Sequence, residues 1–259
     1  MEFSNSTALI TGASGGIGEE FAVQLAARGA NLILVARRAD RLEALREQLT
    51  ERHPGIVVDV VTADLARPGS GAELATRVGE LDRRVDVLVN NAGIGLHGMF
   101  HTQEPEANAG AVQLNCGTLV DLTARFLPSM IERRHGVVIN VASTAAFQPT
   151  PGMAVYGATK AFVLSFTEAL WHENRKSGVR VLALCPGATE TEFFDRTGET
   201  FMTDGRQSAT QVVETALDAL DKSSPTVVSG LRNAVLAMGY RVAPRKLLLA
   251  VSERMLKAQ

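Results

Sequence analysis

A β-strand pattern, a glycine-rich turn and a helix pattern follow one another at the start of the chain. Thr7-Ala8-Leu9-Ile10 is followed by Thr11-Gly12-Ala13-Ser14-Gly15-Gly16-Ile17-Gly18, and residues 16–28 continue with helical spacing. Glycines let the backbone turn tightly and let a phosphate approach the main chain closely. The helix N-terminus beyond them adds unpaired N–H groups and a partial positive charge. No Lys-Ser or Lys-Thr follows the glycines, so a P-loop is excluded. The pattern predicts a nucleotide-binding turn. A glycine loop that only caps a sheet and the glycine turn of a methyltransferase are the alternatives.

Short apolar runs alternate with longer amphipathic stretches along the rest of the chain. Strands are predicted over residues 7–10, 31–36, 56–61, 85–89, 137–141, 179–184 and 226–228, and helices over 16–28, 41–52, 72–81, 108–133, 153–176 and 209–220. Runs such as Leu32-Ile33-Leu34-Val35 are apolar on both faces, which is typical of a sheet covered on both sides. We therefore expect an α/β chain with one domain over residues 1–259. The expected fold is a Rossmann fold with a doubly wound parallel sheet of about seven strands.

Composition excludes several classes of protein. The 259 residues include 26 basic and 28 acidic side chains, a net charge of −2, which argues against a nucleic-acid partner. No apolar run approaches the ~20 residues of a membrane span, and no secretory signal is expected at the N-terminus. Cys116 and Cys185 cannot form a disulfide framework, and reduced thiols suit a cytoplasmic protein. The five histidines are dispersed, so no metal site is expected.

Further motifs resemble those of the short-chain dehydrogenase/reductase family, and they occur in its order over about residues 6–191. The matching segments are Thr11 to Gly18, Asn90-Asn91-Ala92-Gly93, Ser143 with Tyr156 and Lys160, and Pro186-Gly187. The resemblance implies an enzyme that transfers a hydride between a nicotinamide and a ketone or aldehyde, or a secondary alcohol. A non-catalytic NADP-binding regulator of the same fold is the alternative, although intact Ser143, Tyr156 and Lys160 argue against it.

Tyr156 and Lys160 are four residues apart on a predicted helix and therefore share a face. A cation beside a tyrosine favours the phenolate, so we expect a pKa below the usual value near 10. Ser143 follows a strand, where its hydroxyl can hydrogen-bond a carbonyl oxygen. The resemblance implies that Tyr156 is the acid or base, Lys160 the ribose ligand and Ser143 the residue that orients substrate. It also implies that Asn115 holds a water in the proton relay. A surface helix pair is the alternative for Tyr156 and Lys160.

The predicted second strand ends in Val35-Ala36-Arg37-Arg38, without an acidic residue at its tip to accept from a ribose 2′-hydroxyl. Because guanidinium groups suit a 2′-phosphate, we expect NADP(H) to be preferred, with NAD as the alternative. The resemblance implies a larger set of cofactor-binding residues: Gly12, Ser14, Gly15, Gly16, Ile17, Gly18, Arg37, Arg38, Asp64, Leu65, Asn91, Ala92, Gly93, Tyr156, Lys160, Pro186, Gly187, Thr189 and Thr191.

The substrate side is expected in a loop over about residues 192–207. Loops at strand ends commonly form substrate walls. The predicted pocket residues are Ser143, Phe147, Met153, Phe193 and Phe194. All but Ser143 are apolar, which favours a small hydrophobic carbonyl or alcohol. The alternative is that these residues only pack the loop onto the body.

A basic helical tail is expected over about residues 231–259, which carry six basic residues and one acidic residue. Pro244 can start a final helix. Its apolar side is Leu247, Leu248, Val251 and Met255. We expect this side to dock on the body or on another subunit, with peripheral contact to an anionic membrane as the alternative. The family resemblance implies a homodimer or a homotetramer.

Overall fold

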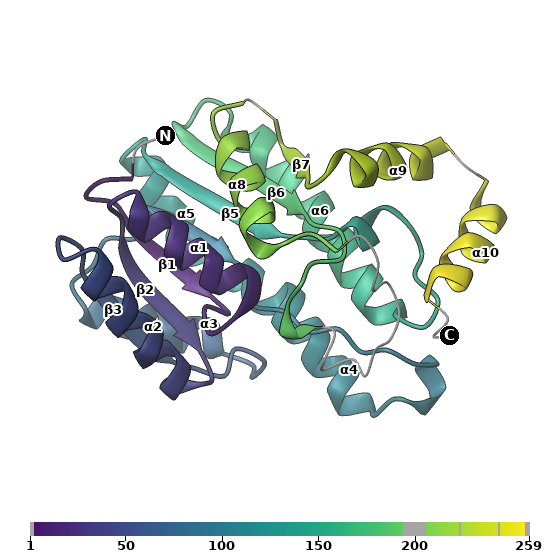
Figure 1. Ribbon diagram of the computed structural model, residues 1–259, viewed down its shortest axis with the longest axis horizontal. Coiled ribbons are helices and arrows are strands. Elements are labelled where there is room, and N and C mark those ends of the chain that lie inside the picture. Colours follow the sequence, from purple (N-terminus) through teal and green to yellow (C-terminus); the bar gives the residue numbers. More distant parts are fainter. Residues whose placement is uncertain (1–2, 194–205, 223, 243, 257–259) are drawn as a thin grey trace.

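The computed structural model describes residues 3–193, 206–222, 224–242 and 244–256. Within these residues, seven strands form one sheet in the order β3-β2-β1-β4-β5-β6-β7 (Figure 1). Every neighbouring pair is parallel. The strands are β1 (Thr7–Thr11), β2 (Asn31–Ala36), β3 (Val58–Thr62), β4 (Val87–Asn90), β5 (Gly136–Val141), β6 (Val179–Cys185) and β7 (Thr226–Val228). The predicted Rossmann-type sheet is confirmed.

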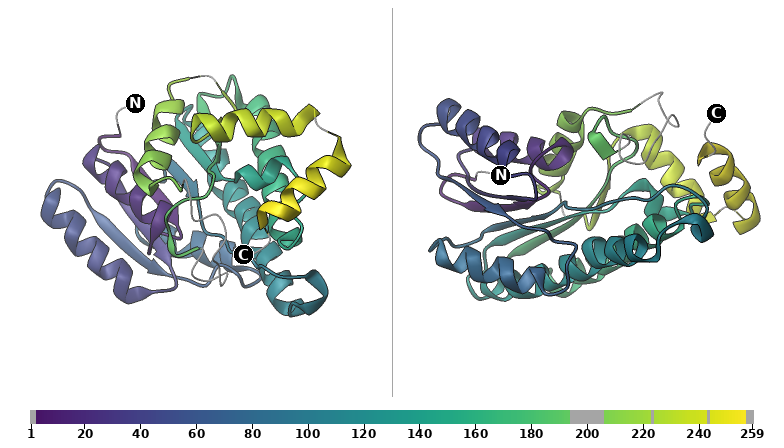
Figure 2. Two further views of the ribbon diagram at one scale, coloured as in Figure 1. Left: turned by 45° about the vertical axis from the view of Figure 1, so that its right-hand side comes forward. Right: turned by 90° about the horizontal axis from the view of Figure 1, so that it is seen from below.

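Helices cover both faces of the sheet (Figure 2). One layer contains α1 (Gly16–Ala27), α2 (Ala39–Arg52) and α8 (Ala209–Ala219), and the other contains α3 (Ser70–Glu80), α5 (Leu119–Glu132) and α6 (Ala154–Asn174). Successive side chains of a strand point to opposite faces. In β2, Leu32 and Leu34 accordingly pack with the first layer, and Ile33 and Val35 pack with the second. Burial on both faces explains why this strand is apolar throughout.

The predicted helix over residues 108–133 is not a continuous α-helix. The chain there forms α4 (Pro105–Val112), a π-helical turn η2 (Gln113–Thr118) and α5. The extra residue of the π turn falls in the segment that contains Asn115, whose side chain is buried. Its amide donates to the carbonyl of Ile94 and to the hydroxyl of Thr159. π-helical turns often occur at functional sites. This one is held by tertiary contacts, so the hydrophobic pattern of the sequence does not reveal it.

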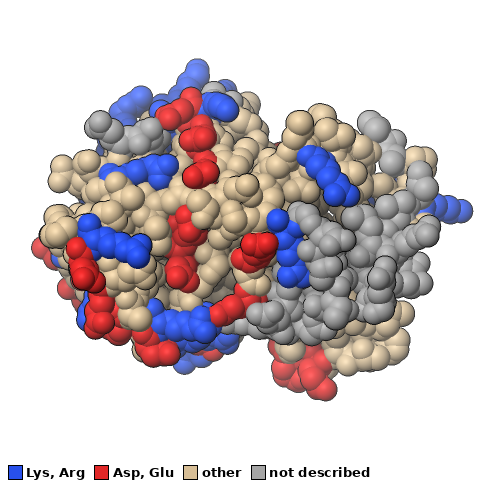
Figure 3. All heavy atoms as spheres, viewed as in Figure 1, with Lys and Arg blue, Asp and Glu red and all other residues tan. Residues whose placement is uncertain are grey.

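The C-terminal part adds two helices, α9 (Leu231–Val242) and α10 (Arg245–Leu256). The remaining short elements are η1 (Phe100–Thr102) and η3 (Thr144–Phe147). Both helices fall within the tail over about residues 231–259 that the sequence predicts to be helical, and α10 begins directly after Pro244. On the face shown in Figure 3, basic and acidic side chains are interspersed over α1 and α2, whereas the surface over α9 is mostly uncharged. Leu231, Val235 and Met238 of α9 are exposed, so its apolar residues do not mark one core-facing side.

Helix α10 lies against the body of the molecule. Leu248 is only 5% exposed, and the hydroxyl of Ser252 donates to the side-chain oxygen of Gln148 over 2.9 Å. The side chains of Leu247, Val251 and Met255 lie outside the described residues. Among the helices that the structure describes, none is both long and apolar enough to cross a bilayer.

Candidate active site

A cavity of about 500 Å³ opens where β1, β4, β5 and β6 end. Gly12, Asn91, Ala142 and Pro186, which follow these four strands, all line it. β1 pairs with both β2 and β4, so the strand order reverses at this point. A crevice at the carboxyl ends of the strands beside such a reversal is the usual ligand site of doubly wound sheets.

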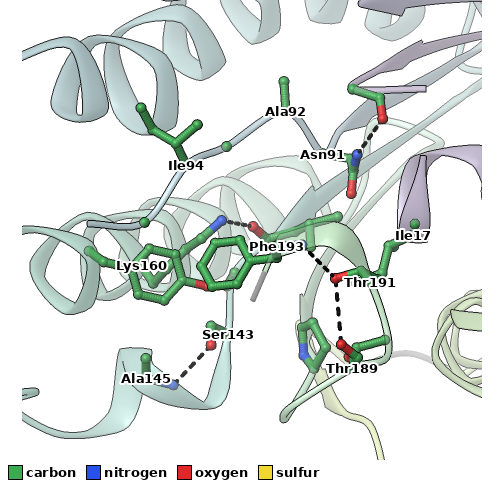
Figure 4. Close-up of a pocket in the computed structure, with 18 of the residues that line it drawn as sticks. Ile17, Asn91, Ala92, Ile94, Ser143, Ala145, Lys160, Thr189, Thr191 and Phe193 are labelled. Carbon is green, nitrogen blue, oxygen red and sulfur yellow. Dashed lines mark hydrogen bonds between the residues drawn. The ribbon is translucent and has the colours of Figure 1, made fainter. Parts of the chain in front are cut away.

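The glycine turn between β1 and α1 forms one end of the cavity. Gly12 and Gly16 have φ angles of +69° and +58°, a region that favours glycine. A Cβ on Gly12 would lie 2.7 Å from the side-chain nitrogen of Asn91, and one on Gly18 would lie 2.3 Å from the carbonyl oxygen of Gly12. Gly18 therefore packs below the turn and does not line the cavity, in contrast to the other five predicted turn residues. The side chain of Asn91 also donates to the carbonyl of Thr11 over 2.9 Å (Figure 4).

Ser143, Tyr156 and Lys160 meet at the other end of the cavity. Ser143 comes shortly after β5, whereas Tyr156 and Lys160 lie one turn apart on α6. Lys160 Nζ donates to the carbonyl of Val141 over 2.7 Å and lies 5.7 Å from the centroid of the Tyr156 ring (Figure 4). Ser143 Oγ accepts from the backbone N–H of Ala145 over 3.1 Å and hydrogen-bonds to Tyr156. The helix therefore carries the phenol to the strand-end serine.

Burial controls the protonation of this end of the cavity. It raises the pKa of Tyr156 to about 12, although the hydrogen bond from Ser143 partly offsets this rise. It also lowers the pKa of Lys160 to about 8. The expectation of a lowered Tyr156 pKa is wrong, because removing the phenolate from water costs more than its neighbours return. At neutral pH the hydroxyl of Tyr156 therefore holds its proton and can donate it.

Asn115 lies behind the cavity and does not line it. Its side-chain oxygen accepts from the N–H of Ile94 over 3.0 Å, and its amide nitrogen donates to Ile94 and Thr159. A Cβ on Gly93 would lie 3.1 Å from this oxygen and 3.5 Å from Lys160 Nζ. The side chain thus fixes the loop after β4 beside the lysine. The water-holding role of Asn115 stays a prediction.

Arginines lie over the glycine turn at the first end. Arg38 donates from Nη2 to the carbonyl of Ser14 over 2.8 Å and from Nε to its hydroxyl over 3.2 Å. Arg38 Nη1 also forms an ion pair of 2.7 Å with Glu192, and Arg41 pairs with the other oxygen of the same carboxylate. The hydrogen bond from Arg38, reinforced by Arg41, lowers the pKa of Glu192. Arg37 is exposed and lines the cavity, whereas the sequence predicted neither Arg41 nor the pairing of Glu192.

The other predicted residues divide into three groups. Those that line the cavity are Asp64, Leu65, Ala92, Gly93, Gly187, Thr189, Thr191, Met153 and Phe193. The ring of Phe193 lies 5.3 Å from that of Tyr156. Phe147 does not reach the wall, because it packs with the cluster around Leu119 and Val163. Phe194 lies outside the described residues.

The C-terminal helices supply wall residues that the sequence did not predict. Asn233, Leu236 and Tyr240 of α9 and Ser252 of α10 line the cavity. The sequence around these residues mixes apolar and polar side chains without a clear apolar face, so it does not identify them as wall residues. Among the described residues, no group of three or more His, Cys, Asp or Glu side chains could hold a metal ion.

Comparisons with known proteins agree with this geometry. The family model described as short chain dehydrogenase matches residues 6–201. A very-long-chain 3-oxoacyl-CoA reductase from Aspergillus terreus is 36% identical over 181 residues, 68% of this chain and 50% of the relative. The chain thus spans about half the length of this curated relative. It also spans 54% of the hydroxysteroid dehydrogenase-like protein 1 from Gallus gallus.

Solved structures match over nearly the whole chain. A short-chain dehydrogenase from Sphingobium yanoikuyae, solved in complex with NADPH, is 36% identical with a TM-score of 0.84 over 95% of both chains. A short chain dehydrogenase/reductase from Burkholderia phymatum, solved in complex with NAD, is 26% identical with a TM-score of 0.82 over 96% of both chains. The family model, the similar sequences and the similar folds together show that this chain belongs to the short-chain dehydrogenase/reductase family of oxidoreductases.

Proposed function

We propose that this protein is an NADP(H)-dependent oxidoreductase that transfers a hydride between the nicotinamide and a hydrophobic ketone or aldehyde, or a secondary alcohol. The observation that carries the proposal is that one cavity holds the Ser143, Tyr156 and Lys160 cluster at one end and the glycine turn with Arg37 at the other. No observation on the described residues favours the alternative of a non-catalytic regulator. A regulator would not need a phenol, a hydroxyl and an ammonium group gathered at one end.

The residues present fit a nicotinamide dinucleotide. Gly12, Gly15 and Gly16 line the cavity, and this turn together with the N-terminus of α1 would hold the diphosphate. Asp64 and Leu65, which follow β3, would hold the adenosine. Asn91, Ala92 and Gly93 would line the floor beneath it, and Pro186, Gly187, Thr189 and Thr191 would hold the nicotinamide end.

The arginines at the tip of β2 support NADP over NAD. Arg37 lines the cavity, and Arg38 is held over the turn by Ser14. Guanidinium groups bind phosphate through charge-assisted hydrogen bonds. The similar structure from Sphingobium yanoikuyae holds NADPH and the one from Burkholderia phymatum holds NAD, so relatives supply precedent for both.

A bound reduced nicotinamide supplies the hydride, and the chain supplies the proton and the geometry. The hydroxyls of Ser143 and Tyr156 hold the carbonyl oxygen, where negative charge develops. Tyr156 then donates its phenolic proton to that oxygen. The raised pKa of Tyr156, about 12, keeps this proton in place at neutral pH, as donation to the carbonyl oxygen requires. Lys160, 5.7 Å from the centroid of the tyrosine ring, stabilises the phenolate that remains and would hold the ribose hydroxyls.

The wall near Tyr156 favours an apolar substrate. Apolar side chains from several separate segments line this part: Ile94, Leu96, Met153, Phe193 and Leu236. Pockets of this kind obtain affinity from apolar area and orientation from a few polar groups. Ser143 and Tyr156 supply those groups here.

A screen of ketones and aldehydes tests the proposal, with oxidation of NADPH followed by absorbance. We expect turnover with bulky apolar carbonyls and little with small charged ones. Binding of NADPH without oxidation across a broad set of carbonyls and alcohols would instead support a regulator. Binding of S-adenosylmethionine in place of any nicotinamide dinucleotide would refute the proposal.

A further inference from the structure

The carboxylate of Glu192 lies inside the arginine end of the cavity. Its two oxygens pair separately with Arg38 and Arg41, which are 154 and 151 residues away in the sequence. A Cβ on Gly15 would lie 3.7 Å from one of these oxygens and 3.1 Å from Arg38 Nη2. An anion of the chain itself therefore lies over the glycine turn, close to the N-terminus of α1.

Arg38 makes hydrogen bonds that do not involve Glu192. Its Nη2 and Nε are hydrogen-bonded to the backbone and side chain of Ser14, which leaves Nη1 for the carboxylate. The ion pairs are accessible to solvent, with side chains of Arg38, Arg41 and Glu192 exposed by 30%, 49% and 37%. Exposed pairs of this kind are weak and can exchange partners. The carboxylate of Glu192 can therefore be replaced by another anion, while Arg38 keeps its hydrogen bonds to Ser14.

We propose that Glu192 is an internal counter-anion that competes with the 2′-phosphate of NADP(H) for Arg38 and Arg41. This inference rests on the proposed function and goes beyond it, because it assigns a residue that restrains the preference for NADP(H). A carboxylate and a dianionic phosphate at the same two guanidinium groups would repel each other. Binding of NADP(H) therefore releases Glu192, whereas NAD(H), which has no such phosphate, leaves the ion pairs intact.

The release of Glu192 also connects the two ends of the cavity. Thr191 contacts the turn so closely that a Cβ on Gly16 would lie 2.8 Å from its methyl group. Phe193 lies 5.3 Å from the Tyr156 ring, measured between ring centroids, and a Cβ on Gly95 would lie 2.6 Å from its ring. Glu192 stands between these two residues. The ion pairs therefore fasten a segment that runs from the turn to the phenol.

Equilibrium binding to Glu192→Gln tests the inference. Glutamine keeps the size of the side chain and removes its charge, so NADPH should bind about threefold to tenfold more tightly, with NADH within about twofold of wild type. Glu190→Gln is the matched control, because Glu190 is exposed and does not line the cavity, and its ratio of NADPH to NADH affinity should not change. An unchanged ratio in Glu192→Gln overturns the proposal. Selective weakening of NADH also overturns it, because Glu192 would then be a ligand of the ribose 2′-hydroxyl.

Two further measurements separate this inference from the proposed function. Adenosine 2′,5′-bisphosphate carries the 2′-phosphate but no nicotinamide, and it should also bind more tightly to Glu192→Gln, whereas 5′-AMP should not. Hydrogen exchange over residues 188–193 should be faster in wild type with NADP⁺ bound than with NAD⁺ bound. If no carbonyl is reduced but both results hold, the proposed function fails and the role of Glu192 stands. If carbonyls are reduced but neither result holds, the role of Glu192 fails alone. If no dinucleotide binds, both are wrong.

Discussion

The two ends of the cavity use charge in opposite ways. At the end that contains Ser143, Tyr156 and Lys160, here called the reaction end, Lys160 is only 6% exposed. Burial raises the pKa of Tyr156 and lowers that of Lys160, so it favours the neutral form of both groups. At the arginine end, the charged side chains of Arg38 and Glu192 stay in contact with water and pair with each other. Desolvation therefore sets the protonation of the first end, whereas exchangeable ion pairs set the anion preference of the second.

Removing the phenolic hydroxyl should have the largest effect, confined to the reaction end. Tyr156→Phe should lower turnover by about 10²–10⁴-fold, because a general acid contributes that much. The affinity for NADPH should stay within about threefold, since the ring still packs against Phe193. Steady-state kinetics and a binding titration measure the two quantities.

Tyr240→Phe is the matched control for this change. Tyr240 is the other tyrosine of the chain, and it also lines the cavity. Its loss should change KM more than turnover. Turnover of Tyr156→Phe within threefold of wild type would show that the proton comes from elsewhere.

Removing the arginines should affect the opposite end. The double substitution Arg37→Ala with Arg38→Ala should weaken NADPH by about tenfold to a hundredfold, because each charge-assisted bond contributes ~1.5–3 kcal/mol before solvent screening. NADH should weaken by less than about threefold. Arg46→Ala on α2 is a control outside the cavity. Equal weakening of both cofactors in a titration would rule out recognition of a 2′-phosphate by these arginines.

The lowered pKa of Lys160 predicts a pH dependence of binding. Because this pKa is about 8, the ammonium form prevails below that pH and is lost above it. Because Lys160 would hold the ribose hydroxyls of an anionic cofactor, the cofactor should bind most tightly when Lys160 is charged. The dissociation constant of NADH, which lacks the titrating 2′-phosphate, should rise about threefold to tenfold from about pH 7 to about pH 9.5. Lys160→Arg keeps its charge throughout and should flatten the profile, whereas the same rise in that variant would assign the titration to another group.

Removal of residues 244–259 should have the smallest effect on either end. Burial of an apolar side chain such as Leu248 contributes about 1.5–3 kcal/mol, so the melting temperature should fall by roughly 3–10 °C. Binding of NADPH should be retained, because the turn and the arginines lie elsewhere. An unchanged melting temperature and mass, together with lost binding to anionic vesicles, would favour contact with a membrane over docking of α10.

Local patterns in the sequence determined the sheet, the glycine turn and the Ser143, Tyr156 and Lys160 cluster. The continuous apolar run of β2 and the four-residue spacing on α6 are properties of single elements, so they can be read without knowing what packs against them. The conformations of Gly12 and Gly16 are equally local. These features fix where a cofactor would lie and which phenol faces it.

Only the tertiary structure decided how these parts are tuned. Glu192 meets Arg38 across 154 residues, and α9 turns Asn233 and Tyr240 toward a cavity that its own sequence does not mark. The direction of the Tyr156 pKa shift depends on how much water the surrounding elements exclude. The π turn at Asn115 likewise depends on partners far along the chain. Desolvation and long-range pairing are sums over many elements, so no single stretch of sequence contains them.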